Sequence, residues 1–271
     1  MAFLFRKLRR SMLDSGASAR YLKYAAGEIL LGVVGILIAL QIDSWNDDRL
    51  DRRQERESLA SMLNDLAVDA ARIDDAVAGN EVLLEGLDDL LGLLALPPDA
   101  LIADPERLRS LFIHALVRSY WYLRVDFSEL TMSQLKSSGG LLLIRDKDVR
   151  DAMLNYQQGL EACKFQYDEM TAYFHVVEAS QKQLLNLRLG KRAFEFIEED
   201  FRRILLPLSD FEQLVPAGQY ILAGDPARFG AYYGDVLFYR TALNNTLLFL
   251  REQRRLGDSL AQLIRESYDL D

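Results

Sequence analysis

The chain has 271 residues, of which 50% are hydrophobic and 27% are charged, and it contains only six prolines and 16 glycines. These proportions are those of a folded protein, and the low proline and glycine counts favour helices over a sandwich of short strands. Residues 1–42 hold six of the 32 basic residues and two of the 41 acidic residues, which leaves 26 basic and 39 acidic residues, a net charge of −13, beyond them. An acidic outer part argues against nucleic acid as a partner, because nucleic-acid binding requires concentrated positive charge.

The first 23 residues are basic and contain a single acid, Asp14. Four apolar residues recur among the bases at helical spacing: Phe3, Leu4, Leu8 and Met12. This pattern predicts that residues 1–23 form a basic amphipathic arm on an anionic membrane surface.

Residues 24–42 are almost all apolar and carry one charge, Glu28. At about 1.5 Å per helical residue they span roughly 28 Å, which is close to the thickness of a bilayer hydrocarbon core. No other segment is comparable, so the sequence predicts one transmembrane helix over residues 24–45, with Trp45 as an interfacial anchor. A cleaved signal peptide would have a shorter apolar core and a small-x-small cleavage site, which this segment lacks. We therefore expect an uncleaved signal-anchor.

The distribution of basic residues predicts the orientation of this helix. Six bases precede the apolar segment, whereas four arginines follow it in residues 43–58. Because the more basic flank usually stays inside the cell, we expect a cytoplasmic N-terminus and an extracytoplasmic main domain.

One face of the predicted membrane helix carries small residues. Tyr21 precedes this row, whose members are separated alternately by three and four residues: Ala25, Glu28, Gly32, Gly35 and Ala39. Residues at this spacing share one helix face. Since rows of small residues let membrane helices approach closely, these five residues are the predicted association face.

Glu28 admits three interpretations. A carboxylate near the hydrocarbon region is a functional candidate by default. It can support helix pairing, it can occupy a harmless position about 6 Å inside the cytoplasmic end of the segment, or it can handle ions or protons.

The pattern of residues 46–271 predicts helices throughout. Apolar residues recur at threes and fours from residue 46 to about 95, and Asp104-Pro105, Asp146-Lys147 and Asp225-Pro226 are typical helix starts. The predicted helices after the first cover residues 105 to about 123, 128–138, 147–189, 193–206 and 226–268, with Gly139 ending the second of them. The sequence therefore predicts an all-α protein, in which one transmembrane helix precedes an elongated antiparallel helical bundle over residues 46–271.

The chain offers few groups for chemistry. Cys163 is the only cysteine and is expected to be buried, and His114 and His175 have no convergent metal-ligand spacing. The acidic pairs Asp88-Asp89 and Glu198-Glu199-Asp200 diverge around their helices by about 100° per residue, so they form no acid/base site. The aromatic run 120–122 is expected to fill the core. We expect no enzyme activity, no catalytic residue, no cofactor and no metal.

Two stretches carry a family resemblance. They are Gly27-Glu-Ile-Leu-Leu-Gly-Val-Val-Gly-Ile-Leu-Ile-Ala-Leu-Gln-Ile-Asp-Ser-Trp-Asn46 and Leu135-Lys-Ser-Ser-Gly-Gly-Leu-Leu-Leu-Ile144. Together they resemble a group of bacterial single-pass membrane proteins that are common in Bacteroidota and are grouped as a domain of unknown function. The resemblance implies a membrane location and a helical outer domain. It supplies no activity and no catalytic residues.

The leading hypothesis is a bacterial inner-membrane protein with a periplasmic helical bundle, which acts as a scaffold or sensor through protein contacts. Its expected partners are the lipid bilayer and either further copies of itself or another membrane protein. Two alternatives remain: an oligomeric transport or channel component that uses Glu28, and a receptor for a small ligand in the bundle.

Overall fold

The computed structural model describes residues 17–119, 121–222 and 224–270, and the side-chain surroundings in this range from Tyr24 onward. The chain divides into two compact units, residues 1–57 (unit 1) and residues 58–271 (unit 2). Helix α2 (Ala17–Leu94) contributes to both units. Most of the predicted basic arm, residues 1–16, lies outside the described residues.

Unit 1 contains the predicted membrane segment, and all of its described residues belong to α2. Residues 26–50 are exposed along the whole of their length. Among the described residues, α2 is the one helix that is long and apolar enough to cross a membrane.

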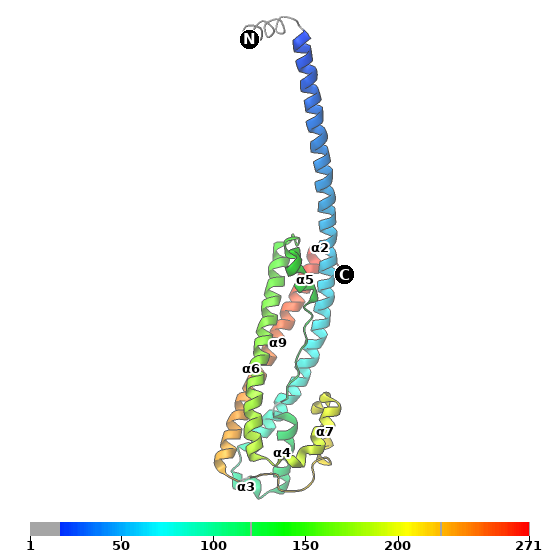
Figure 1. Ribbon diagram of the computed structural model, residues 1–271. Helices are drawn as coiled ribbons and strands as arrows, with labels where there is room; N and C mark the ends of the chain where they lie inside the picture. The colour runs from blue at the N-terminus through cyan, green and yellow to red at the C-terminus, as the bar shows by residue number, and fades with distance from the viewer. Residues whose placement is uncertain (1–16, 120, 223, 271) are drawn as a thin grey trace. The chain divides into compact units, whose positions relative to one another are not determined.

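Unit 2 is a bundle of helices, as predicted. Its elements after α2 are α3 (Pro98–Ile102), α4 (Pro105–Arg118), α5 (Leu130–Ser138), η1 (Gly140–Leu142), α6 (Lys147–Leu184), η2 (Leu187–Gly190), α7 (Lys191–Glu199), η3 (Phe201–Leu205), α8 (Ser209–Glu212) and α9 (Pro226–Tyr268). The described part of the chain contains no strand, and its one β-bridge joins Leu185 to Ile221. Helices α6 and α9 lie side by side and run in opposite directions (Figure 1). The all-α prediction is therefore confirmed.

Three helices begin where the sequence predicts, because an aspartate caps each one. Asp104 accepts hydrogen bonds from the backbone N–H groups of the first turn of α4, and Asp146 does the same for α6 at 2.8 and 3.1 Å. Asp225 accepts from the N–H of Ala227 at 3.0 Å at the start of α9. These bonds satisfy donors that a helix cannot pair internally, and they hold the pKa of Asp146 below its usual value.

Three helix ends differ from the prediction. Helix α4 ends at Arg118 instead of about residue 123, because the following residues are held in an extended conformation by other helices. Helix α6 ends at Leu184 instead of Leu189, because the next residue pairs with Ile221. The predicted helix over residues 193–206 is divided at Asp200, whose side chain accepts from the N–H of Arg202 and starts η3.

The second part of α2 carries a continuous buried row. Its members alternate at spacings of three and four: Leu59, Met62, Leu66, Asp69, Ile73, Ala76, Asn80, Leu83, Leu87, Leu90 and Leu94. This is the spacing of a helix that packs against neighbouring helices along one seam. Two of these inner positions, Asp69 and Asn80, are polar.

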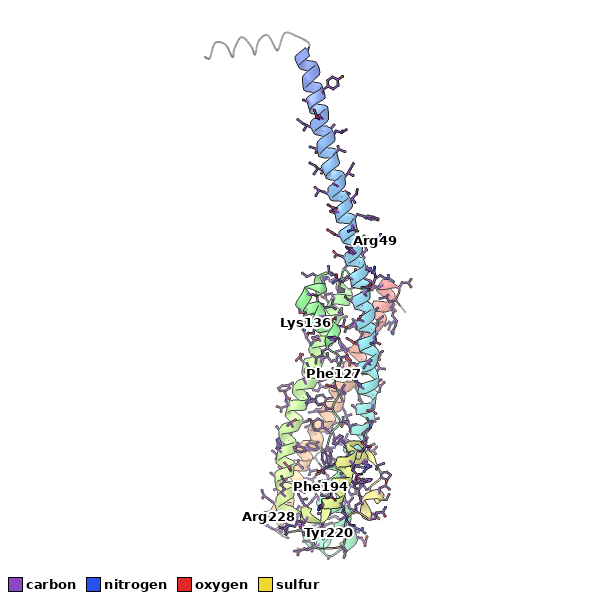
Figure 2. All side chains as sticks on the ribbon, turned by 45° about the vertical axis from the view of Figure 1, so that its right-hand side comes forward. Arg49, Phe127, Lys136, Phe194, Tyr220 and Arg228 are labelled. Atoms are coloured by element: carbon purple, nitrogen blue, oxygen red, sulfur yellow. The ribbon has the colours of Figure 1, made fainter. Side chains whose placement is uncertain are left out.

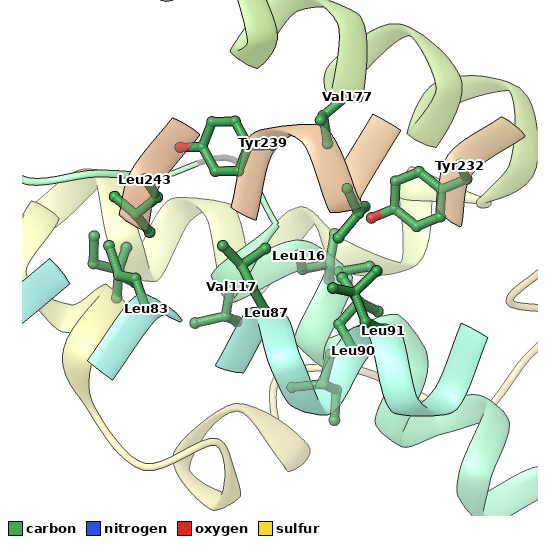
Figure 3. Packing of buried hydrophobic residues seen from close by; sticks show 14 of the residues in the cluster. Leu83, Leu87, Leu90, Leu91, Leu116, Val117, Val177, Tyr232, Tyr239 and Leu243 are labelled. Carbon is green, nitrogen blue, oxygen red and sulfur yellow. The ribbon is translucent and has the colours of Figure 1, made fainter. Parts of the chain in front are cut away.

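The buried apolar residues of unit 2 form two clusters. The larger cluster draws on α2, α4, α6 and α9, and Figure 3 shows Leu87, Leu116, Val177 and Tyr239 converging in it. The smaller cluster joins α2, α5, the first half of α6 and the end of α9. Along α2 the two clusters are separated between Leu66 and Ile73, where Asp69 lies.

Ion pairs connect the surfaces of α2 and α9. The acids lie seven residues apart on α2, and the pairs are Asp74 with Arg254 at 3.0 Å, Glu81 with Arg251 at 2.5 Å and Asp88 with Arg240 at 2.8 Å. Each pair is partly exposed, so each contributes only about 0.2–1 kcal/mol to stability. The arginines follow one another on α9 in the reverse order of the acids on α2, as two antiparallel helices require.

Candidate functional sites on α2 and in the bundle

The structure places the predicted association face on an exposed, unbroken stretch of α2. Glu28, Gly32, Gly35 and Ala39 are exposed, and Ala25 is partly buried. A Cβ atom added at Gly32 or Gly35 would meet nothing within 4 Å. Because the helix is continuous here, the spacing of these residues puts them on one face.

The remaining surface of this stretch is apolar. Leu31 is 78% exposed, Ile29 is 68% exposed and Trp45 is 64% exposed. Figure 2 shows the side chains of this part of α2, up to Arg49, standing away from the helix. An apolar surface this large is a hallmark of a membrane or protein contact.

In unit 2, residues 121–129 form an extended segment without regular structure, which we call the strap. Asn80 of α2 is fully buried and holds the strap at Leu123, donating to its carbonyl at 2.9 Å and accepting from its N–H at 2.7 Å. The Tyr167 hydroxyl accepts from the N–H of Val125 at 2.9 Å. The Tyr239 hydroxyl donates to the carbonyl of Trp121 at 2.9 Å. Side chains from three helices thus replace the backbone partners that the strap lacks.

The end of the strap is bound by a buried carboxylate. Asp69 is 1% exposed and accepts from the N–H of Ser128 at 2.7 Å and from the Tyr156 hydroxyl at 2.8 Å. Arg72 donates to the carbonyl of Asp126 at 2.5 Å. Burial raises the pKa of Asp69, although its hydrogen bonds and the nearby Arg72 partly oppose the rise.

This polar cluster connects the strap to α6 and α9. Gln253 of α9 donates to the carbonyl of Tyr156 at 3.1 Å, and Tyr156 binds Asp69. Phe127 of the strap, labelled in Figure 2, packs against both apolar clusters. Asp69 and Tyr156 are both nearly inaccessible, so the cluster links the strap, α2, α6 and α9 within the interior of unit 2.

Cys163 is confirmed as a buried residue. Its thiol lies 3.8 Å from the carbonyl of Phe249, and burial raises its pKa to about 12. A thiol in this state is a poor nucleophile, because the thiolate is the reactive form.

The histidines have separate local contacts. His114 Nδ1 lies 2.8 Å from the carbonyl of Ser110, and its Nε2 lies 3.7 Å from Asp89. His175 is exposed and lies 3.9 Å from Glu178. Within the described part of the chain, no group of three or more His, Cys, Asp or Glu side chains is placed to hold a metal.

The acidic pairs are divided among different partners. Asp88 binds Arg240, whereas its neighbour Asp89 faces His114. Glu199 binds Arg203 at 2.6 Å, whereas Asp200 caps η3.

The two described residues of the aromatic run, Trp121 and Tyr122, are partly buried and pack against the larger apolar cluster. Trp121 packs edge-on against Phe201, with 5.5 Å between ring centroids. Tyr122 stacks on Tyr167 at 5.9 Å, and Tyr120 lies outside the described residues.

Asp69 and Asn80 escaped the sequence analysis, although the sequence carries a signal for both. The apolar row on α2 skips from Leu66 to Ile73 and is interrupted again near residue 80. A polar residue at an inner position of such a row usually has a specific partner.

Arg118, at the end of α4, is a further buried polar residue that the sequence analysis missed. It is 4% exposed, its guanidinium donates to the carbonyl of Leu206 at 2.7 Å, and burial lowers its pKa to about 10. Gly86 makes room for Arg118, because a Cβ at position 86 would lie 2.5 Å from the Arg118 side chain.

Comparison of the chain with known protein families, with curated proteins and with solved structures finds no match.

Proposed function

We propose that this chain is a single-pass membrane protein whose helical outer unit acts as a scaffold or sensor through protein contacts. The observation that carries the proposal is the exposed apolar surface of α2 over residues 24–42. Its length suits a bilayer, and its row of small residues suits a second helix.

The association face would bind another copy of the chain or a larger membrane partner. Single cysteines placed at Gly32, Gly35 or Ala39, in a Cys163→Ala background, should form cross-linked oligomers in membranes. Cysteines at Val33 and Leu37 lie on other faces of α2 and serve as controls. Equal cross-linking at all five positions would contradict the proposed face.

The proposed location is the bacterial inner membrane, with a cytoplasmic N-terminus and a periplasmic unit 2. Leu142 in η1 is 84% exposed, so a Leu142→Cys variant in the same background reports the side on which unit 2 lies. A membrane-impermeant maleimide should label this cysteine once the periplasm is opened. If labelling requires rupture of the inner membrane, unit 2 lies in the cytoplasm and the proposed orientation is wrong.

The exposed carboxylate on the association face supports one other function, a transport component with a ring of protonatable Glu28 side chains. Changing Glu28 to Gln keeps the side-chain shape and removes the charge. Under the transport hypothesis it abolishes proton leak or conductance in vesicles. Under the scaffold hypothesis it leaves assembly and leak unchanged.

A further inference from the structure

The part of α2 that follows the apolar segment carries two rows of opposite charge. Both rows belong to unit 1. The basic row consists of four arginines: Arg49, Arg52, Arg53 and Arg56. The acidic row consists of three aspartates spaced by four: Asp43, Asp47 and Asp51. At about 100° per residue, the arginines fall within an arc of about 100°, and the aspartates are centred about 170° away from them.

Both rows are accessible. All four arginines are exposed, Asp43 and Asp47 are exposed, and Asp51 is partly exposed. Arg53 pairs with Glu57 on its own helix at 2.8 Å, and both side chains remain mostly exposed. The rows therefore form a surface on which a partner can place charges.

The sector between the rows continues the association face. Asn46 lies seven residues after Ala39, so both residues fall on nearly the same side of the helix, and Leu50 follows one turn later. Asn46 and Leu50 are exposed. When two such helices pair about a two-fold axis through this sector, the arginine row of each lies against the aspartate row of the other.

The charge balance favours a second copy over lipid headgroups as the occupant. Residues 43–57 contain six acids against four arginines, a net charge of −2. An anionic membrane surface attracts basic segments, and here the acids cancel that attraction. A second copy satisfies both rows at once, because it presents the complementary row on each side.

We propose that residues 43–57 dock against the same residues of a second copy of this chain, arginine row to aspartate row. The proposal rests on the membrane anchoring proposed above, which holds two copies side by side in one orientation. It deepens that proposal by assigning the partner and by adding charges that set the register of the pair.

The first test is cross-linking through single cysteines in a Cys163→Ala background, in native membranes. Asn46→Cys lies in the sector between the rows, whereas the matched control Ser44→Cys is about 160° away on the same helix. The proposal expects disulfide formation about tenfold faster at position 46, and a fall of several-fold when salt is raised from about 0.05 M to about 0.5 M. Equal rates at the two positions would overturn it.

The second test exchanges the charges. One Asn46→Cys variant changes the four arginines to glutamate, and another changes the three aspartates to lysine. Each variant alone should lose most of its cross-linking, since its two rows then repel. Co-expression should restore cross-linking between the two variants, which differently sized tags resolve. Loss without restoration would overturn docking between copies and would favour lipid headgroups as the partner.

A separate measurement distinguishes failure of this inference from failure of the anchor. Each variant is extracted with alkaline carbonate, which removes proteins that do not cross the membrane. Retention in the membrane without charge-dependent cross-linking overturns the docking and leaves the anchoring intact. Release of the unmodified chain overturns the anchoring itself, and with it the proposed side-by-side arrangement.

Discussion

At the scale of single residues, the buried row of α2 is apolar except at Asp69 and Asn80. Each of these side chains binds backbone groups of the strap, and each is almost completely inaccessible. A buried polar group is costly unless its partners are in place, so these residues penalise any other packing of the strap.

Asp69 makes stability depend on pH. Its pKa is raised in the folded chain above the unfolded value of about 3.9, so the folded chain binds the proton more tightly. The free energy of unfolding should therefore rise, relative to an Asp69→Asn variant, as pH falls through the raised pKa toward about 3.9. Denaturant titration of the full chain in detergent micelles, repeated between pH 7 and pH 4, measures this difference. If the free energy of unfolding of the unmodified chain fell relative to that of Asp69→Asn as pH is lowered, the raised pKa of Asp69 would be contradicted.

Asn80 should be needed for stability because it supplies both partners of Leu123. Changing Asn80 to Leu leaves a buried N–H and a buried carbonyl unpaired, and we expect a loss of about 2–4 kcal/mol. The same change at the exposed Asn245 should alter stability by less than about 0.5 kcal/mol. Denaturant unfolding followed by circular dichroism compares the two variants. Similar effects at both positions would exclude the proposed role of Asn80.

At the scale of elements, the contact between α6 and α9 depends on a glycine. A Cβ atom at Gly159 would lie 2.0 Å from the side-chain oxygen of Gln253, which is 1% exposed. A side chain at position 159 would therefore displace the buried side chain of Gln253. At Gly234 of α9, an added Cβ would meet nothing within 4 Å.

Alanine substitutions at these two glycines should have opposite effects. Gly159→Ala should destabilise unit 2 by about 1–3 kcal/mol, because the strain of overpacking exceeds the gain in helix propensity. Gly234→Ala should stabilise it by up to about 1 kcal/mol, because only the propensity changes. Thermal unfolding measures the stability of each variant relative to the unmodified chain. Stabilisation by both would show that the Gln253 side chain can move aside without cost.

The elements also show which signals the sequence carried. Helix starts could be predicted at Asp104, Asp146 and Asp225 because an N-cap is a local interaction between a side chain and its own next turn. The end of α4 could not be predicted in this way. The residues after Arg118 are held by hydrogen bonds from Asn80 and from two tyrosines that are distant in sequence, Tyr167 and Tyr239. The association face follows from spacing alone. The polar cluster required knowledge of which helices are neighbours.

At the scale of the whole molecule, unit 2 contains two apolar clusters of unequal size with Asp69 at their boundary along α2. The smaller cluster includes Met132 of α5, Met153 of α6 and Ile264 of α9. It buries less apolar surface than the larger cluster, so it has less to stabilise it against local opening.

Hydrogen exchange in low denaturant should therefore resolve two levels of protection. We expect the amides of α5 and of the first half of α6 to exchange at lower denaturant concentration than those of α4. Mass spectrometry of the full chain in micelles measures both sets of amides in one experiment. A single level of protection across these helices would show that the polar boundary does not divide the unit.

The strap has a consequence for how the chain is made. Three hydrogen bonds of the strap join residues that are distant in sequence. Leu123 and Asn80 are 43 residues apart, and Val125 and Tyr167 are 42 residues apart. Trp121 and Tyr239 are 118 residues apart. Contacts of such separation form late, because a long loop must close before they are made. During synthesis the ribosome completes α2 and the strap long before it supplies α9. The bond between Tyr239 and Trp121 should therefore form last, and the start of the strap should remain open to chaperones and proteases until the final helix has been released.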